Sequence, residues 1–196
     1  MTHGVKVFLG LAVGAGAGVA VFWWTHRNDP GALIDQIGDA LATLTTSDET
    51  RLSQMQVDAQ AATRALIDDL AGQGIPVHIG QTLRTSAQEK SAIDSGHSAV
   101  TTVSWHQLGR AVDLYPLYAD GTTDYSGDNL PAIAAIAGTA ERYGFRQLAF
   151  NADGSKKIIH NAAGKAIWDS GHIEFRAPYS TIAEAVSAEG ADFGLA

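Results

Sequence analysis

The sequence contains no cysteine among its 196 residues. A disulfide framework, a thiol nucleophile and a thiolate metal site are therefore excluded. Charged residues are also scarce, at 17% of the chain, and 21 Asp and Glu outnumber 13 Lys and Arg to give a formal net charge of −8. Because the sequence has no basic cluster dense enough to neutralise phosphates, we expect no nucleic-acid partner.

Apolar residues form one long run, over residues 5–24, which is interrupted only by Lys6. A helix rises 1.5 Å per residue, so a run of this length would span about 30 Å of hydrocarbon. Trp23 and Trp24 lie at one end, where an aromatic belt belongs, and Lys6 marks the other end as cytoplasmic. We therefore expect a single-pass inner-membrane protein with a cytoplasmic amino terminus and a periplasmic catalytic domain.

Small residues are concentrated within this apolar run. Gly10, Gly14 and Gly18 would give a helix one smooth face, which would allow a homodimer in the membrane. The segment resembles the signal-anchor-release segments of phage endolysins. A cleaved signal peptide, with residues 15–17 as the small-residue site, is the alternative. Cleavage there would leave an apolar stretch exposed at the new terminus, so we favour the anchor.

The remaining chain has the length and hydrophobic content of a single domain with its own core. Apolar residues at helical spacing predict an amphipathic linker helix over 29–46, one helix from Thr46 to about residue 71 that opens on a Thr46–Glu49 capping pair, and helices over 86–94 and 130–143. Strands are expected over 77–83, 111–115 and 172–175, with a hairpin of strands 145–150 and 157–160. The predicted fold class is α+β: a small antiparallel sheet with helices packed on one side, preceded by one N-terminal transmembrane helix. The expected domains are a signal-anchor (1–28), the linker helix (29–46) and a catalytic domain (47–196).

Two short motifs carry the chemistry: SWHQLGRAVD at 104–113 and WDSGHIE at 168–174. Apolar residues alternate with Asp113 and with His172, as in strands that are buried on one face only. If the strands are neighbours, Asp113 and His172 are cross-strand partners, at about 5 Å between Cβ atoms. Gly109 allows the chain to turn so that His106 reaches the same face. His106, Asp113 and His172 are therefore the predicted ligands of a catalytic zinc ion, which takes three protein ligands and leaves a position for water.

Two further carboxylates lie near this ligand set. Asp169 precedes His172 by three residues, and we assign it as the general base. It would work best if partial burial beside Trp168 raised its pKa toward the working pH. Glu174 shares a strand face with His172. It would orient that imidazole as an acceptor or would be a solvated strand residue.

The run Ser-x-His-x-x-Gly-x-Ala-x-Asp, followed downstream by Asp-x-x-His-x-Glu, resembles the zinc D-alanyl-D-alanine carboxypeptidase and L-alanyl-D-glutamate endopeptidase family. The resemblance covers about residues 50–178 and implies the fold of these D-Ala-D-Ala peptidases, which the hedgehog proteins share. It also implies a zinc ion on His106, Asp113 and His172, with Asp169 as the catalytic acid. An Asp at 169, where the carboxypeptidase branch often has Glu, is closer to the phage endolysin branch. Gly171 departs from the family, which often has Pro before the last His.

The resemblance extends upstream to residues 83–88, which are similar to an Arg-Ser-x-x-Gln stretch in which the Arg faces the substrate. It implies that Arg84 stabilises the carbonyl oxyanion or grips a substrate carboxylate. Gln88, Ser98 and Ser104 are candidates to line the cleft, although turn and capping roles explain Ser equally well. The expected partner is therefore a peptidoglycan peptide.

These features predict a zinc metallopeptidase that hydrolyses peptidoglycan stem peptides in cell-wall lysis, most simply as an L-Ala-D-Glu endopeptidase. A D-alanyl-D-alanine carboxypeptidase that remodels the wall is an alternative. A non-catalytic, metal-containing wall-binding protein is the alternative from another class, but such a protein would need no base at Asp169.

Overall fold

The computed structural model describes residues 44–98, 102–161 and 163–195. Four strands form an antiparallel sheet in the order β1 (Val77–Gln81), β2 (Ala111–Pro116), β6 (His172–Phe175) and β3 (Phe145–Gln147). The second motif thus forms the strand beside the first, although about 60 residues separate them in the sequence. A separate two-stranded sheet consists of β4 (Ile159–His160) and β5 (Ala166–Ile167).

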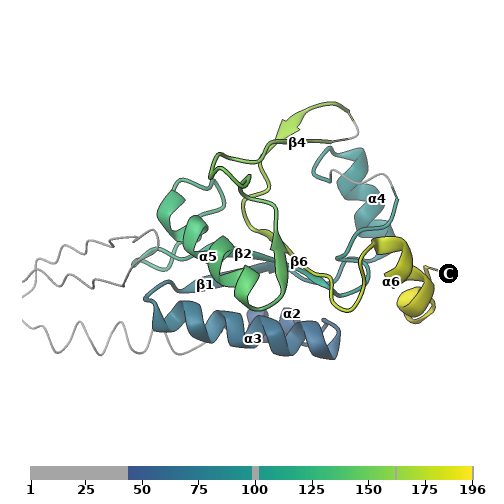
Figure 1. Cartoon of the computed structure of the whole chain (residues 1–196), viewed down its shortest axis with the longest axis horizontal. Helices are drawn as coiled ribbons and strands as arrows, with labels where there is room; N and C mark the ends of the chain where they lie inside the picture. Colours follow the sequence, from purple (N-terminus) through teal and green to yellow (C-terminus); the bar gives the residue numbers. More distant parts are fainter. Residues whose placement is uncertain (1–43, 99–101, 162, 196) are drawn as a thin grey trace, which may run out of the picture. The chain divides into compact units, whose positions relative to one another are not determined.

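The described helices are α2 (Thr46–Leu52), α3 (Val57–Gly72), α4 (Ser86–Asp94), α5 (Leu130–Arg142) and α6 (Ile182–Glu189), which continues into the short 3-10 helix η1 (Gly190–Phe193). Figure 1 shows α2 and α3 running along one side of the sheet, with α4 on the other side. The main core lies between the sheet and α2, α3 and α5, and includes Leu66, Ile79, Val112, Ile136 and Ile173. The predicted α+β class, a small antiparallel sheet backed by helices, is confirmed.

The single helix predicted after Thr46 is wrong, because the chain breaks at residues 53–56 into α2 and α3. The cap also lies one residue earlier, at Thr45, whose side chain and that of Asp48 form the reciprocal capping box. The break has a tertiary cause: the Gln56 N–H donates to the carbonyl of Gly109 in the first motif, at 3.0 Å. Apolar spacing continues through the break, so the pattern alone does not reveal it.

The predicted hairpin between strands 145–150 and 157–160 is also wrong in its pairing. β3 pairs with β6, and β4 pairs with β5. Only an isolated bridge joins Phe150 to Lys156 across the turn that the sequence predicts there. The turn itself forms, because the Asn151 N–H donates to the Ser155 carbonyl at 2.8 Å and the Lys157 N–H donates to the Ala149 carbonyl at 2.9 Å. The Ala149 carbonyl also accepts from the Trp168 indole N–H, at 2.6 Å. The chain therefore leaves the sheet after Gln147 and packs against Trp168, the first residue of the second motif.

The predicted localisation, a single-pass inner-membrane protein, is contradicted: no helix within residues 44–98, 102–161 and 163–195 is long and apolar enough to cross a bilayer. The apolar run at 5–24, the Gly10/Gly14/Gly18 face and nearly all of the linker helix lie outside the described residues. The domain boundaries at 28 and 46 stay predictions.

Candidate metal centre

The pairing of β2 with β6 brings together two of the predicted ligands, which the strand pattern placed on one face. Asp113 and His172 are direct register partners. Val112, Leu114 and Ile173 point to the opposite face and are at most 2% exposed in the core. The cross-strand relationship predicted from alternation is confirmed.

The third ligand, His106, comes from the turn that precedes β2. Gly109 adopts φ +63° and its N–H donates to the His106 carbonyl, which closes the turn. The same carbonyl accepts from the backbone N–H of Arg84, at 3.1 Å. His106 is 2% exposed, so its ring is held over the sheet by the packing around it.

Three side-chain atoms converge at this point. His106 Nε2 lies 3.2 Å from Asp113 Oδ1 and 3.1 Å from His172 Nδ1, and the last two atoms are 3.0 Å apart. Zinc bonds of about 2.0–2.1 Å at tetrahedral angles would place neighbouring ligand atoms about 3.3 Å apart. The triangle is therefore close to the size that one such ion requires, and these three residues form a group that could hold a metal ion.

The outer nitrogens of both rings fix which atoms carry protons. His106 Nδ1 lies 2.7 Å from the carbonyl oxygen of Thr82, which can only accept, so Nδ1 carries the hydrogen and Nε2 presents a lone pair. His172 Nε2 lies 3.4 Å from Glu174 Oε1, which leaves Nδ1 as the lone-pair nitrogen in the neutral ring. Two nitrogen lone pairs and one carboxylate oxygen thus converge, and they repel one another unless a proton or a cation lies between them. Metal-bound histidines show this arrangement, with the other N–H donated to a carbonyl or carboxylate.

Glu174 is fixed in turn by arginine. It accepts from Arg176 Nε and a terminal Arg176 nitrogen at 2.8 and 2.6 Å, and Arg146 lies 3.9 Å away. Burial raises the pKa of the Glu174 carboxyl, but its contacts with His172 and Arg176 outweigh burial and lower the pKa below the usual range. Glu174 is therefore an ionised acceptor that holds the His172 ring. The sequence alone also allowed Glu174 to be a solvated strand residue.

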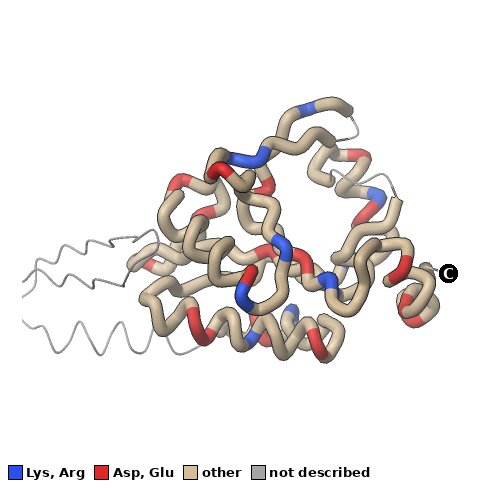
Figure 2. The backbone as a smooth tube through the Cα atoms, viewed as in Figure 1, with Lys and Arg blue, Asp and Glu red and all other residues tan. Residues whose placement is uncertain are grey.

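Elsewhere the charges are mixed in sign, and Figure 2 shows acidic and basic positions interspersed along the described backbone.

The same atoms compete for protons when no cation is bound. Burial disfavours the imidazolium of His172, but its bonds to Asp113 and Glu174 outweigh burial and raise the pKa of His172 well above its ordinary value. Burial likewise opposes ionisation of Asp113, yet the two imidazoles beside it lower its pKa. Metal binding must therefore release a proton from the site.

Asp169 lies half-buried near the ligand triangle, between Trp168 and Ser170. Its carboxylate accepts no hydrogen bond from the described residues. Burial raises the pKa of Asp169, the charge of His172 opposes this, and the charge of Asp113 adds to it. The sequence predicted this direction and this cause. An unpaired carboxylate with a raised pKa is suited to accept and return a proton.

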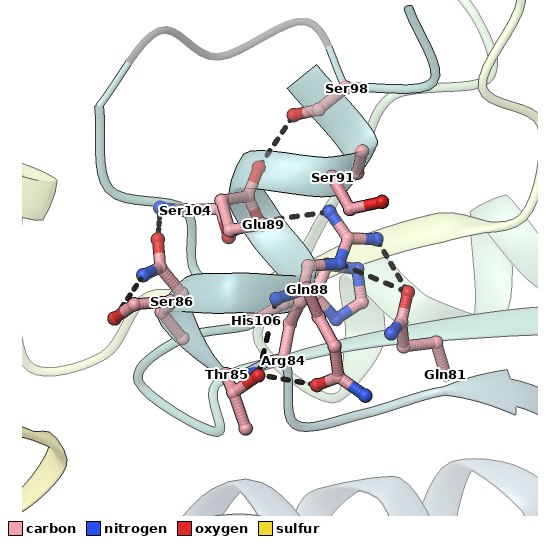
Figure 3. Close-up of polar contacts among 12 residues, drawn as sticks. Gln81, Arg84, Thr85, Ser86, Gln88, Glu89, Ser91, Ser98, Ser104 and His106 are labelled. Atoms are coloured by element: carbon pink, nitrogen blue, oxygen red, sulfur yellow. Dashed lines mark hydrogen bonds and ion pairs between the residues drawn. The ribbon is translucent and has the colours of Figure 1, made fainter. Parts of the chain in front are cut away.

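Arg84 is held on two sides, as Figure 3 shows. Its Nε and one terminal nitrogen donate to Gln81 Oε1 at 3.1 and 2.5 Å, and its other terminal nitrogen donates to Glu89 Oε2 at 2.9 Å. A guanidinium has five N–H donors, so two of them remain for a ligand. The side chain is 13% exposed, which leaves it a narrow opening toward solvent.

Glu89 is the residue that sequence reasoning missed. It is 2% exposed, and it also accepts from the hydroxyls of Ser98 and Ser104, at 2.7 and 2.6 Å (Figure 3). Burial raises the pKa of Glu89, but these bonds and Arg84 outweigh it and lower the pKa. Its position in the first turn of α4 resembles that of any acidic residue at a helix start, so the sequence carries no signal of its burial.

The other predicted substrate residues have structural partners as well. The amide oxygen of Gln88 accepts from the N–H of Thr85 in the capping box of α4, and Gln88 is exposed. The Ser104 hydroxyl is buried and donates to Glu89. The structure thus brings Arg84 and Ser104 onto one carboxylate beside His106, whereas Gln88 lies at the solvent side of α4. Their contacts with substrate stay predictions.

Comparison with known proteins gives a structural likeness only. No protein-family profile and no curated protein sequence matches the chain. Among solved structures, the chain is similar to ChiX, an L-Ala D-Glu endopeptidase of Serratia marcescens, with 21% identity over 67% of this chain and 87% of that chain and a TM-score of 0.47. It is also similar to the LD-carboxypeptidase LdcB, with 17% identity over 70% of this chain and 64% of that chain and a TM-score of 0.45.

A third similar structure is VanYB in complex with D-alanine-D-alanine, with 16% identity over 70% of this chain and 78% of that chain and a TM-score of 0.44. A further structure of the VanY D,D-pentapeptidase, a variant in complex with Zn(II), is similar at 15% identity over 69% of this chain and 78% of that chain, with a TM-score of 0.44.

Proposed function

We propose that this chain is a zinc metallopeptidase that hydrolyses peptidoglycan stem peptides, and that it acts as an L-Ala-D-Glu endopeptidase. The observation that supports it best is the meeting of three lone pairs, on His106, Asp113 and His172, beside the unpaired carboxylate of Asp169. A structural metal site has no need of a free carboxylate next to it, whereas a hydrolytic site needs one to move a proton.

The donor set suits zinc. Two imidazole nitrogens and one carboxylate oxygen are ligands that zinc takes in catalytic sites, with a fourth position left for water. When bound by these three residues, zinc would supply Lewis-acid chemistry to the scissile carbonyl and would lower the pKa of a water molecule to about 7. The outer contacts to Thr82 and Glu174 orient the two rings so that His106 Nε2 and His172 Nδ1 face the position of the ion.

The chain's own residues divide the remaining work. Asp169 accepts the proton of the attacking water and then delivers it to the leaving amine, as its raised pKa allows. Arg84 directs its two remaining N–H groups at the carbonyl oxygen or at a substrate carboxylate, and Gln81 and Glu89 keep it from turning away. Gln88 and Ser104 would also contact the substrate. The catalytic domain in this proposal is residues 47–196.

The test is mass spectrometry of purified peptidoglycan after digestion by the full chain, with added zinc and with a chelator. New amino termini at D-Glu that disappear with the chelator are the expected result. Release of free D-Ala alone would replace the endopeptidase by the carboxypeptidase. Absence of any chelator-sensitive product would overturn the peptidase proposal in favour of a wall-binding protein.

An Asp169→Ala variant separates catalysis from metal binding in the same assay. We expect it to bind zinc as the parent does and to lose turnover, because only the proton carrier is removed. Asp94→Ala is the matched control, since Asp94 is exposed and its carboxylate bonds to Lys90 on the same helix. Full activity of the Asp169 variant would remove this residue from the mechanism.

A further inference from the structure

Tyr115 lies on the strand that carries a metal ligand, two residues after Asp113. Alternate residues of a strand share a face, so Tyr115 emerges on the face of the ligand triangle and not on the core side with Leu114. Tyr115 is not among the predicted metal ligands, the predicted general base or the predicted substrate residues.

Two glycines locate the far half of the ring. A Cβ built on Gly80 would lie 2.6 Å from Tyr115 Cε2 and 3.6 Å from the Cβ of Asp113, and one built on Gly171 would lie 2.8 Å from Tyr115 Cε1. Gly80 is therefore level with Asp113, and the carbonyl of Gly171 accepts from the N–H of Leu114. The ring thus leans back along β2, and its hydroxyl end points toward the ligands.

The neighbouring strands leave room for this ring only because both positions lack a side chain. A Cβ at less than 3.0 Å from a ring atom forces something to move. On the solvent side, Tyr125 meets the ring edge-on, with the centroids 4.9 Å apart. Tyr115 is therefore confined between β1, β6 and Tyr125, with little freedom to rotate away from the site.

The hydroxyl of Tyr115 forms no hydrogen bond to any residue within 44–98, 102–161 and 163–195. A tyrosine phenol ordinarily keeps its hydrogen at neutral pH, so this group has a donor to offer. Because no buried side-chain polar atom of the described residues lacks a partner, this hydroxyl is open to solvent and can be reached by a ligand.

We propose that Tyr115 is a further catalytic residue of the site, whose hydroxyl donates a hydrogen bond to the oxygen of the scissile carbonyl as negative charge develops there. The inference rests on the proposed peptidase function. The phenol keeps its proton throughout, so no bond to it forms or breaks. Together with Arg84 it would supply two fixed donors to one oxygen, one charged and one neutral.

Tyr115→Phe tests the role, because it removes the hydroxyl and keeps the ring that the two glycines accommodate. We expect kcat to fall about 100- to 1,000-fold, as for loss of one oxyanion donor, with KM and zinc content little changed. Tyr125→Phe is the matched control, since it removes a hydroxyl from the neighbouring ring, and it should leave kcat near the parent value.

A second readout does not depend on turnover. A phosphinic analogue of the L-Ala-D-Glu dipeptide presents a charged oxygen like that of the transition state, and its affinity for the zinc-loaded full chain can be measured by calorimetry. The affinity of Tyr115→Phe for this analogue should fall by about the same factor as kcat, whereas its affinity for the product that begins with D-Glu should equal that of the parent. If the Tyr115 hydroxyl served only in packing, the substitution would change the affinities for the phosphinic analogue and for the product together.

The outcomes separate the two proposals. If the parent hydrolyses peptidoglycan and Tyr115→Phe matches it in kcat and in phosphinate affinity, the role of Tyr115 is overturned and the peptidase stands. If the parent neither cleaves nor binds the phosphinate, the proposed function fails and the role of Tyr115 fails with it. Gly80→Ala gives an independent check, because its Cβ would displace the Tyr115 ring and should lower kcat without loss of zinc.

Discussion

Asp113 of β2 and His172 of β6 are register partners, and the carboxylate oxygen of one lies 3.0 Å from the imidazole nitrogen of the other. Backbone pairing in the sheet therefore sets the ligand geometry, and only His106 has to be placed by a turn. Asp113 and His172 cannot separate unless the central strands β2 and β6 separate, and this pairing makes the site rigid.

Replacing Asp113 by Asn should cost more metal affinity than any change outside the triangle. The amide keeps the shape of the side chain but removes the negative charge that neutralises the ion. Loss of an outer partner typically costs about 10- to 100-fold in affinity, and loss of this direct ligand should exceed that. Competition for zinc with a chromophoric chelator measures the effect, with Asp94→Asn as the control. Equal affinities would show that Asp113 is not a ligand.

Glu174→Gln tests the outer contact to the metal site. The amide can still accept from His172, but it no longer offers the charge that favours ligand basicity. Zinc affinity should fall by about 10- to 100-fold. The same chelator competition gives the answer, and Glu141→Gln on the surface of α5 is a control of equal chemistry. If Glu174→Gln retains the zinc affinity of the parent, Glu174 pairs with Arg176 but does not support the metal site.

Glu89→Gln should loosen Arg84 without touching the ligands. The buried carboxylate is replaced by an amide that has an N–H where Arg84 or a serine now donates, so one of those bonds is lost. We expect a stability loss of about 1–3 kcal/mol for the broken buried contact. We also expect a fall in kcat/KM with zinc content unchanged. Chemical denaturation and steady-state kinetics measure the two effects, and unchanged kcat/KM would leave Glu89 with a purely structural role.

The ligand triangle could be predicted from the sequence because it depends on short-range rules. Strand alternation fixes the faces of Asp113 and His172, and a glycine at 109 signals the turn that returns His106. Asp169 could be proposed as the general base because it lies three residues before His172 in the sequence. Each of these inferences needs only the local pattern and the assumption that the two strands are neighbours.

The sequence did not reveal the contacts that depend on distant packing. Glu89 is buried only because Ser98 and Ser104 return over α4, and the break between α2 and α3 exists because Gln56 bonds to Gly109. The hairpin error has the same origin, since β3 finds a better partner in β6 than in the strand that follows it. Local propensity located most of the elements but missed the break between α2 and α3, the strand β5 and the helix α6, and it did not indicate which strands pair.

Acid should weaken the attachment of the carboxyl-terminal segment. Arg110 donates two hydrogen bonds of 2.7 Å to Glu189 at the end of α6, and these lower the pKa of that carboxyl, against burial. A carboxyl whose pKa is lowered in the folded state stabilises the protein above its unfolded pKa of about 4.3, and this stability is lost as the pH falls through the lower, folded value. The unfolding free energy of the parent should therefore fall more steeply below pH 5 than that of Glu189→Gln. If the unfolding free energies of the parent and of Glu189→Gln fall with the same slope, the Arg110–Glu189 pair does not contribute to the pH dependence of stability.

Gly109 and Gly138 should respond in opposite directions to alanine. Gly109 adopts φ +63°, and a Cβ there would lie 3.2 Å from the Gln54 carbonyl oxygen, so Gly109→Ala combines backbone strain with a close contact to rigid backbone. We expect a loss of about 1–3 kcal/mol in unfolding free energy and weaker zinc binding, because the turn that places His106 must shift.

Gly138 lies on the exposed side of α5, where a Cβ meets nothing within 4 Å. Gly138→Ala should therefore stabilise the protein by about 0.5–1 kcal/mol through lower chain entropy in the unfolded state, and should leave zinc affinity unchanged. Urea denaturation of both variants, followed by chelator competition, checks the pair. Equal zinc affinity in the parent and Gly109→Ala would mean that the turn does not govern the position of His106.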